Sequence, residues 1–163
     1  MGKIAFVFPG QGAQVVGMGQ NVYENSAVAK DEFEQASKAV HLDLKALCFE
    51  ENNDINITEF TQVCLLTTSV AIMEELKTRG VKADVAAGLS LGEYTAHIAS
   101  GSMEFADGVR LVKKRGKYMQ EEVPVGKGAM AAIIALSAED VIACCEEASK
   151  VGICSPANFN CPG

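Results

Sequence analysis

Val85-Ala-Ala-Gly-Leu-Ser-Leu-Gly-Glu-Tyr94 places a serine between two glycines where a short apolar run gives way to a helical pattern. A serine on such a tight strand-to-helix turn projects from the sheet, and the flanking glycines remove side chains that would clash there. The helix that follows aims its first N–H groups and its positive end at charge developing beside Ser90. The stretch predicts a nucleophile elbow and acyl transfer through a seryl ester, with a plain turn or helix cap as the alternative.

A second glycine-rich loop follows the first apolar run of the chain. Lys3–Phe8 is typical of a buried strand and continues directly into Pro9-Gly-Gln-Gly-Ala-Gln14. An oxyanion hole needs two convergent backbone N–H donors, one usually from the residue after the nucleophile and one from another loop. Leu91 and Gln11 are therefore the candidate donors, and the alternative is a glycine-rich turn that binds nothing.

Strand and helix patterns alternate along the chain in the manner of an α/β protein. Continuous apolar runs in the strands favour a parallel sheet with helices on both faces and the active loops at the carboxyl ends of the strands. Gly80 is the predicted stop of the longest helix. Strands are expected at 3–8 and 84–88, and helices within 27–50 and at 58–79, 91–100 and 104–122.

A second unit is predicted beyond the glycine-containing segment 123–128. Ser137 is a helix N-cap for the predicted helix 138–149, with Asp140 three residues after it. Apolar strands at 129–136 and 153–159, on either side of this helix, complete a βαβ pattern. The expected units are residues 1–125 and 126–163.

Arg115 falls on the apolar arc of the predicted helix 104–122, at about 100° per residue. A guanidinium in apolar surroundings is costly unless a carboxylate pairs with it, and arginine can grip a carboxylate with two parallel hydrogen bonds. Two interpretations remain: an internal ion pair, with Glu93 or Glu122 as partner, or a site for an acidic group of a bound molecule. The same helix carries basic residues on its opposite face, namely Arg110, Lys113, Lys114 and Lys117.

Composition restricts the classes of function. The chain has 163 residues, of which 48% are hydrophobic and 21% charged, as in an ordinary globular protein. A net charge of −7 argues against a nucleic-acid partner. No apolar run reaches the roughly 18 residues that a membrane span needs, which favours the cytoplasm.

The six cysteines have neither Cys-x-x-Cys spacing nor a companion histidine cluster. The sequence therefore predicts no metal site and no disulfide framework. Cys48 and Cys64 lie in apolar helical patterns and are expected in the core, whereas Cys144 and Cys145 are expected to be partly exposed.

A serine nucleophile needs a general base, and the chain has two histidines. His97 lies seven residues after Ser90 on one predicted helix. The helical rise separates the two by about 10 Å, beyond the reach of a hydrogen bond. His41 follows a helix in a polar stretch and needs no catalytic role. Both are expected to be structural.

The pair of motifs Phe8-Pro-Gly-Gln-Gly-Ala-Gln14 and Gly88-Leu-Ser-Leu-Gly-Glu-Tyr94 resembles the malonyl-CoA:acyl-carrier-protein transacylase family. The resemblance runs from Met1 to Gly163 and covers about half of a usual member. Leu89 stands where many relatives have histidine, and Val63-Cys64 stands where Pro-Ala is frequent. Neither departure touches the serine chemistry.

The resemblance implies transfer of a malonyl group from malonyl-CoA to the phosphopantetheine thiol of acyl carrier protein through malonyl-Ser90, in fatty acid biosynthesis and without a cofactor. Arg115 would bind the malonyl carboxylate, and Gln62, Asn158 and Asn160 would lie near the substrate. Asn158 and Asn160 fit strand-end turns equally well.

The resemblance also implies a domain assignment. Residues 1–125 would form an incomplete hydrolase-like acyltransferase subdomain, and residues 126–163 the first half of a ferredoxin-like one. The catalytic histidine of the family belongs to a later segment, so the chain is expected to be truncated and impaired.

Two alternatives stay open. A serine esterase or thioesterase would let water complete the reaction, although a simple ester offers Arg115 no carboxylate. A catalytically inactive fragment or interaction module would take no acyl group at all. The basic face of helix 104–122 is either solvated or a contact for acyl carrier protein or coenzyme A phosphates.

Overall fold

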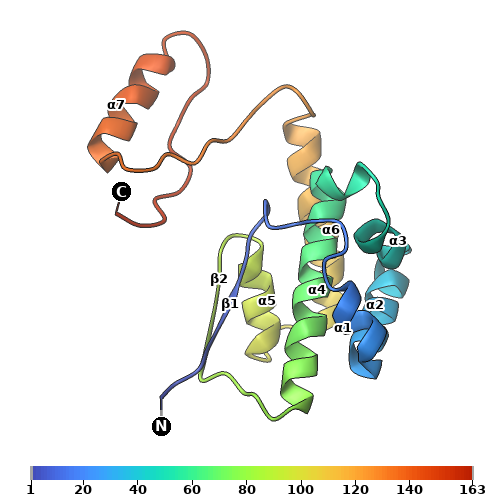
Figure 1. Cartoon of the computed structure of the whole chain (residues 1–163). Helices are drawn as coiled ribbons and strands as arrows, with labels where there is room; N and C mark the ends of the chain where they lie inside the picture. The colour runs from blue at the N-terminus through green and yellow to red at the C-terminus, as the bar shows by residue number, and fades with distance from the viewer. Residues whose placement is uncertain (1, 163) are drawn as a thin grey trace. The chain divides into compact units, whose positions relative to one another are not determined.

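A two-stranded parallel sheet lies beside a layer of helices in the computed structural model, which describes residues 2–162 (Figure 1). Strand β1, Ala5–Phe8, pairs with β2, Val85–Gly88, so that Ala5 lies opposite Val85 and Phe8 opposite Gly88. Parallel neighbours need a long crossover connection, and the helices between the two strands provide it. The predicted α/β class is confirmed.

The crossover is a run of helices, of which α2 and α3 have side-chain N-caps. The Ser26 side chain accepts a hydrogen bond from Ala29 N–H where α2 begins, and Asp43 accepts two where α3 begins. The last helix ends just before Gly80, whose φ of 80° suits glycine, so the predicted stop is confirmed. In order the elements are α1 (Gln20–Asn25), α2 (Ala27–Val40), α3 (Leu44–Phe49), the short 3-10 turn η1 (Asp54–Asn56) and α4 (Thr58–Thr78).

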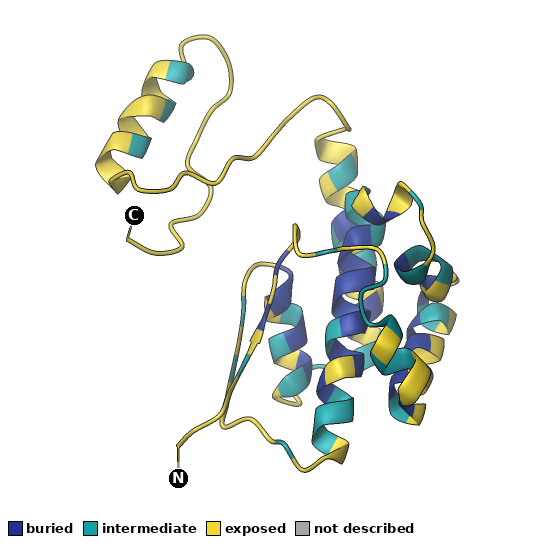
Figure 2. Cartoon of the chain, viewed as in Figure 1, coloured by how far each residue is buried: buried dark blue, intermediate teal, exposed yellow. Residues whose placement is uncertain are grey.

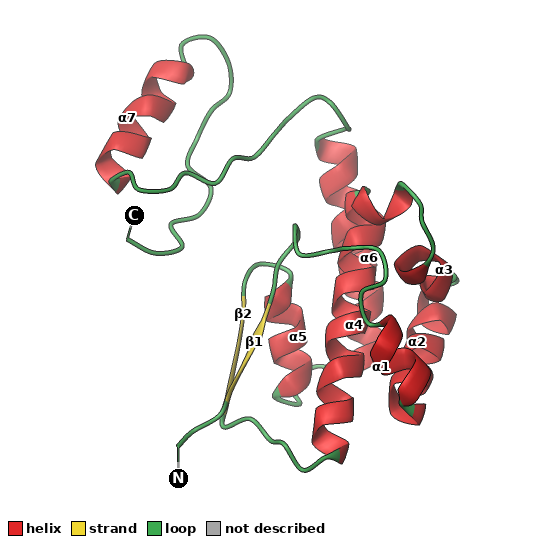
Figure 3. Ribbon diagram, in the orientation of Figure 1, coloured by secondary structure: helices red, strands yellow, loops and turns green. Residues whose placement is uncertain are grey.

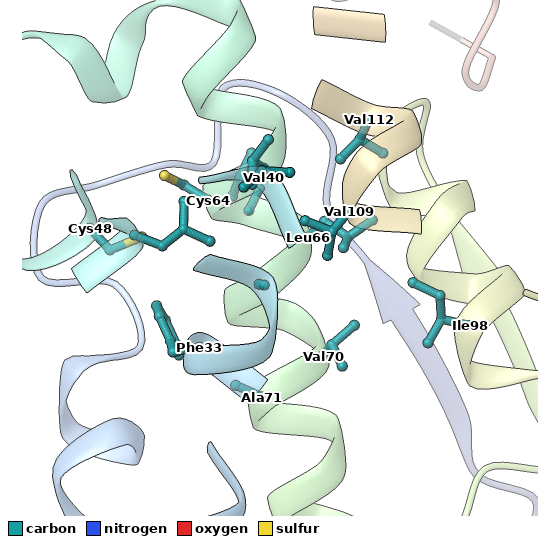
Figure 4. Close-up of a cluster of buried hydrophobic side chains, with 14 of the residues drawn as sticks. Phe33, Val40, Cys48, Cys64, Leu66, Val70, Ala71, Ile98, Val109 and Val112 are labelled. Carbon is teal, nitrogen blue, oxygen red and sulfur yellow. The ribbon is translucent and has the colours of Figure 1, made fainter. Parts of the chain in front are cut away.

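Helix α4 is the centre of the first unit. Every residue from Thr61 to Thr68 is buried, because α2, α5 and α6 all pack against this helix (Figure 2). A helix buried on most sides has no polar face to turn to water, so its position is determined by packing. The core around it contains Phe33, Val40, Cys48, Cys64, Leu66, Val70, Ala71, Ile98, Val109 and Val112 (Figure 4).

Helices α5, Gly92–Ala99, and α6, Phe105–Glu122, complete the first unit. Gly116 allows α6 to approach the start of α4 closely: a Cβ at this position would lie 2.8 Å from the carbonyl oxygen of Thr58 and 2.8 Å from the Cα of Glu59. This contact determines where α6 lies along the axis of α4. It therefore also determines the position of Arg115, one residue before Gly116.

Cys48 and Cys64 are buried core residues, as predicted. The neighbouring Cys48 thiol, together with burial, holds the pKa of Cys64 well above its ordinary range. Cys64 is therefore a protonated packing group at neutral pH.

Within the first unit, helices cover one face of the sheet. Phe6 and Phe8 point towards the core, whereas Val7 is 74% exposed and Val85 is 54% exposed on the other face. The helices of the first unit lie on the Phe8 side of the sheet (Figure 1).

A second compact unit begins at Gly126. Its helix α7, Ala138–Ala148, is capped as predicted, with Ser137 Oγ accepting from Asp140 N–H at 3.1 Å. The predicted strands 129–136 and 153–159 are wrong, because both segments lack regular structure (Figure 3). A strand gains its hydrogen bonds from a neighbour, and no segment within residues 2–162 pairs with either one. The ferredoxin-like assignment stays a prediction.

Among residues 2–162, no helix has both the length and the apolar character needed to cross a membrane.

Glu32 on α2 lies in a half-buried acidic cluster. Burial raises its pKa from the ordinary 4.5 to about 7, helped by the charges of Glu74 and Asp31 and opposed by Lys77. Lys77 is itself paired with Glu74 at 2.7 Å. Between pH 4.5 and about 7, Glu32 is therefore protonated in the folded chain and ionised in the unfolded chain.

We predict that this proton makes the free energy of unfolding fall as pH rises through that window. Glu32→Gln removes the titration, so at about pH 8 the variant should be roughly 1 kcal/mol more stable than wild type, the size being limited by solvent screening. At about pH 4.5 the two should be equal. Urea unfolding at both pH values tests this, with the exposed Glu34→Gln on the same helix as control. A gain that does not change with pH would contradict the assignment.

Candidate functional site

Ser90 sits on a strained turn between β2 and α5. Its φ of 50° lies in the left-handed region, which is uncommon for a residue with a side chain. A Cβ on Gly88 would lie 2.0 Å from the carbonyl carbon of Gly92, so this glycine is required by the turn. The exposed Ser90 and the two flanking glycines form the elbow that the sequence predicts.

The end of β1 packs directly on this elbow. A Cβ on Gly92 would lie 2.2 Å from the carbonyl oxygen of Phe8, and one on Gly10 would lie 2.8 Å from the carbonyl oxygen of Leu89. Leu89 N–H also donates to the Phe8 carbonyl at 3.1 Å. These close approaches bring the loop after β1, with Gln11, beside the serine turn.

The two expected oxyanion donors come from these two segments. Gly92 N–H and Glu93 N–H are bonded to the carbonyls of Leu89 and Ser90. Within residues 2–162, no acceptor is bonded to the backbone N–H of Leu91 or of Gln11. Both N–H groups therefore lack an intramolecular partner within that range, as the donors of an oxyanion hole would.

Arg115 reaches Ser90 from α6. Its Nη2 donates to Ser90 Oγ at 3.0 Å, and its Nη1 donates to Gln62 Oε1 at 2.8 Å. The internal ion pair that the sequence left open is not formed, because the hydrogen-bond partners of Arg115 in the described chain are an amide and a hydroxyl. Within residues 2–162 the guanidinium thus lies beside Ser90 without a carboxylate partner.

Gln62 is fully buried on α4 and holds Arg115 in this position. Its Oε1 accepts from Arg115, while its Nε2 lies 3.1 Å from the Sδ of Met119. Because the Gln62 amide nitrogen contacts Met119, the amide oxygen faces the Arg115 guanidinium. The structure places Gln62 against Arg115, and its place near the substrate, which the resemblance implies, stays a prediction.

Tyr94 is a site residue that the sequence reasoning missed. The guanidinium of Arg115 lies over its ring, 5.6 Å from the centroid, in a cation–π contact. Tyr94 lies in the first turn of α5, four residues after Ser90. That spacing was the available signal.

Both histidines make local contacts away from Ser90. His97 Nδ1 lies 3.0 Å from Ser102 Oγ, and His41 is the left-handed C-cap of α2, with φ 55°. The prediction that both are structural agrees with these contacts. Ser90 has Arg115 as its side-chain partner among residues 2–162.

Asn158 and Asn160 belong to the second unit, where both are exposed in a segment without regular secondary structure. Their predicted place near the substrate stays a prediction.

Intramolecular contacts use much of the basic face of α6. Arg110 pairs with Asp107 at 2.6 Å, and Lys117 pairs with Glu121 at 3.7 Å. Lys113 donates to the carbonyl of Val40 at 2.8 Å. These contacts favour the interpretation of this surface as a solvated helix face over a preformed anion site.

The chain is similar to a family of acyltransferases. The acyl transferase domain family matches residues 5–159. The chain is 47% identical to the malonyl CoA-acyl carrier protein transacylase of Escherichia coli K12 over its whole length, which is 53% of that protein.

Two solved structures are similar to the chain. The malonyl CoA-acyl carrier protein transacylase of Clostridium perfringens superposes with a TM-score of 0.91 at 47% identity, covering 99% of this chain and 52% of that one. The second is a structure of a type II PKS acyl-carrier protein in complex with its malonyl-transacylase. The match has a TM-score of 0.91 at 43% identity and covers 99% of this chain and 53% of that one. The chain thus spans about half the length of the proteins that it matches.

We predict that Gly92→Ala disrupts the elbow. A Cβ held 2.2 Å from the carbonyl oxygen of Phe8 cannot be accommodated by a side-chain rotation, so β1 or α5 must move. The expected loss is about 3 kcal/mol or more in the free energy of unfolding, measured by urea denaturation. The control is Gly2→Ala, whose Cβ would meet nothing within 4 Å. Equal stability of both variants would contradict the close packing of β1 on the elbow.

Proposed function

Since this chain belongs to the acyl transferase domain family, we propose that it carries the acyl-serine site of an enzyme that transfers a malonyl group from malonyl-CoA to the phosphopantetheine thiol of acyl carrier protein. The names of its relatives support this assignment. A relative solved together with its acyl-carrier protein supports the choice of acceptor. We place the protein in the cytoplasm and its reaction in fatty acid biosynthesis.

The contact of Arg115 with Ser90 carries the proposal. A guanidinium 3.0 Å from the nucleophile, with no carboxylate bonded to it among residues 2–162, is suited to an acyl group that brings its own carboxylate. The malonyl group has that carboxylate two carbons from the carbonyl that Ser90 attacks. Acetyl and long-chain acyl groups lack it.

The proposed reaction has two halves. Ser90 Oγ attacks the thioester carbonyl, the Leu91 and Gln11 N–H groups stabilise the oxyanion, and the C–S bond breaks to release the coenzyme A thiolate. The thiol of the carrier then attacks malonyl-Ser90 and restores the serine. The local contacts of His41 and His97 leave Ser90 without a histidine. We therefore assign the general base to a histidine of the whole protein that lies outside these 163 residues, and expect the chain itself to react slowly.

Malonyl-CoA should acylate Ser90 in the present chain. We expect intact-protein mass spectrometry to detect one malonyl adduct that is absent from Ser90→Ala. Persistence of the adduct until a pantetheine thiol is added would indicate transfer, whereas rapid loss to water would favour the thioesterase alternative. A folded chain that takes no adduct would favour the inactive-fragment alternative.

Replacing Arg115 should change the choice of acyl group. A charged hydrogen bond contributes about 1.5–3 kcal/mol, so Arg115→Ala should lower the malonyl acylation rate roughly 10- to 100-fold. Acetylation by acetyl-CoA should change much less, because no carboxylate is involved. The matched control is Arg110→Ala on the same helix, whose partner is the exposed Asp107. An equal loss for both acyl groups would show that Arg115 does not read the carboxylate.

A further inference from the structure

The loop that carries Gln11 has little packing to hold it. Gln11, Gly12 and Ala13 are all exposed, and the Gly12 φ of 108° marks a glycine-dependent turn. Inside the loop, Gln14 Oε1 accepts from Gly12 N–H at 2.8 Å. An exposed loop of this kind keeps a single conformation only if specific hydrogen bonds tether it.

Two side-chain amides provide the tethers, and both bind the segment where α4 begins. Gln11 Nε2 donates to Thr58 Oγ1 at 3.1 Å, and Gln14 Nε2 donates to Asn56 Oδ1 at 3.1 Å. The loop and the upper end of α4 lie side by side in Figure 1. Thr58 is therefore the one direct anchor of the Gln11 side chain in the described chain.

Thr58 is itself held from the opposite side by α6. Its N–H donates to Gln120 Oε1 at 3.3 Å, and Gln120 Nε2 donates to the carbonyl of Val123. The Thr58 carbonyl lies so close to Gly116 that a Cβ there would be 2.8 Å away. The hydroxyl group is thus presented to Gln11 by a backbone that two contacts with α6 restrain.

We propose that Thr58 is a positioning residue, which holds the Gln11 side chain so that the Gln11 backbone N–H is aimed at the oxyanion formed at Ser90. The inference rests on the proposed function, because it gives Gln11 a place in the oxyanion hole. Such donors stabilise a transition state only when they are oriented before the reaction. Thr58 acts through Gln11 and does not contact the acyl donor.

This role has a kinetic signature. The concentration of acyl donor that half-saturates the reaction should not depend on Thr58, because Gln11 N–H is needed in the transition state and not for binding. The acylation rate at saturation should fall in Thr58→Val, which keeps the shape of threonine and removes the acceptor. A displacement of about 1 Å in a catalytic group lowers rates by up to about 100-fold.

The experiment measures acylation of Ser90 by intact-protein mass spectrometry in Thr58→Val, Thr58→Ser and wild type. Two donors are used: malonyl-CoA, and p-nitrophenyl acetate, an uncharged ester that forms the same oxyanion without needing Arg115. Thr58→Val should be about 10- to 100-fold slower with both donors, with an unchanged half-saturating concentration, and Thr58→Ser should restore the rate. The control Thr78→Val, at the far end of α4 where Thr78 Oγ1 bonds the Glu75 carbonyl, should react like wild type.

Gln11→Met gives a second test that does not alter α4. It removes the same hydrogen bond from the loop side, so the double variant Gln11→Met/Thr58→Val should be no slower than either single variant. Additive losses would overturn the proposal, as would a Thr58→Val rate equal to wild type. Equal losses in Thr58→Val and Thr58→Ser would also overturn it, because they would indicate a general disturbance of the start of α4.

The two donors separate this inference from the proposed function. Wild type that is acetylated at Ser90 by the ester but not malonylated would refute malonyl transfer, and the Thr58 variants would still be judged by their acetylation rates. Wild type that neither donor acylates at Ser90 would refute both.

Discussion

The close approach of β1 to the start of α5 is the constraint on which the site depends. With a hydrogen in place of a side chain at Gly92, the helix begins almost in contact with the Phe8 carbonyl, and Ser90 is forced to a φ of 50° in the turn before it. The same contact determines where the chain leaves β1, so it also places the loop of Gln11. Ser90 and the first residues of the Gln11 loop are therefore located by one backbone packing event, and the hydrogen bonds of Gln11 to Thr58 and of Gln14 to Asn56 hold the rest of the loop.

A second constraint is the set of polar contacts between Gln62 on α4 and two side chains of α6. Gln62 is a buried amide on the most buried helix of the chain, and burial of an unpaired amide is costly. Arg115 and Met119, four residues apart on α6, occupy the two ends of that amide. The side chain that directs the guanidinium towards Ser90 thus also satisfies a polar group in the core, which couples the stability of the α4–α6 contact to the geometry of the site.

Local patterns were enough to predict the elbow, the loop after β1 and the long helices, because glycine spacing and apolar periodicity are properties of short segments. They also placed Arg115 on a mostly buried face. They could not identify its partners, because a helical projection gives a direction and not the residue met in that direction; Gln62 is on another helix, 53 positions earlier. The prediction of strands at 129–136 and 153–159 was wrong for a related reason. The apolar pattern of these segments is typical of strands, but a strand also requires a paired neighbour.

The position of Arg115 has a consequence for how the proposed substrate would bind. In the structure its Nη2 is bonded to a neutral hydroxyl, Ser90 Oγ. A carboxylate is a stronger acceptor for a guanidinium than a hydroxyl is, and can accept two parallel bonds. An arriving malonyl group would therefore take this N–H from Ser90 and leave the lone pairs of the hydroxyl oxygen directed at the thioester carbonyl. An acyl group without a carboxylate would have to react with Ser90 still bonded to the guanidinium. On the proposed function, Arg115 would therefore discriminate twice, by binding the malonyl carboxylate and by restraining Ser90 when that carboxylate is absent.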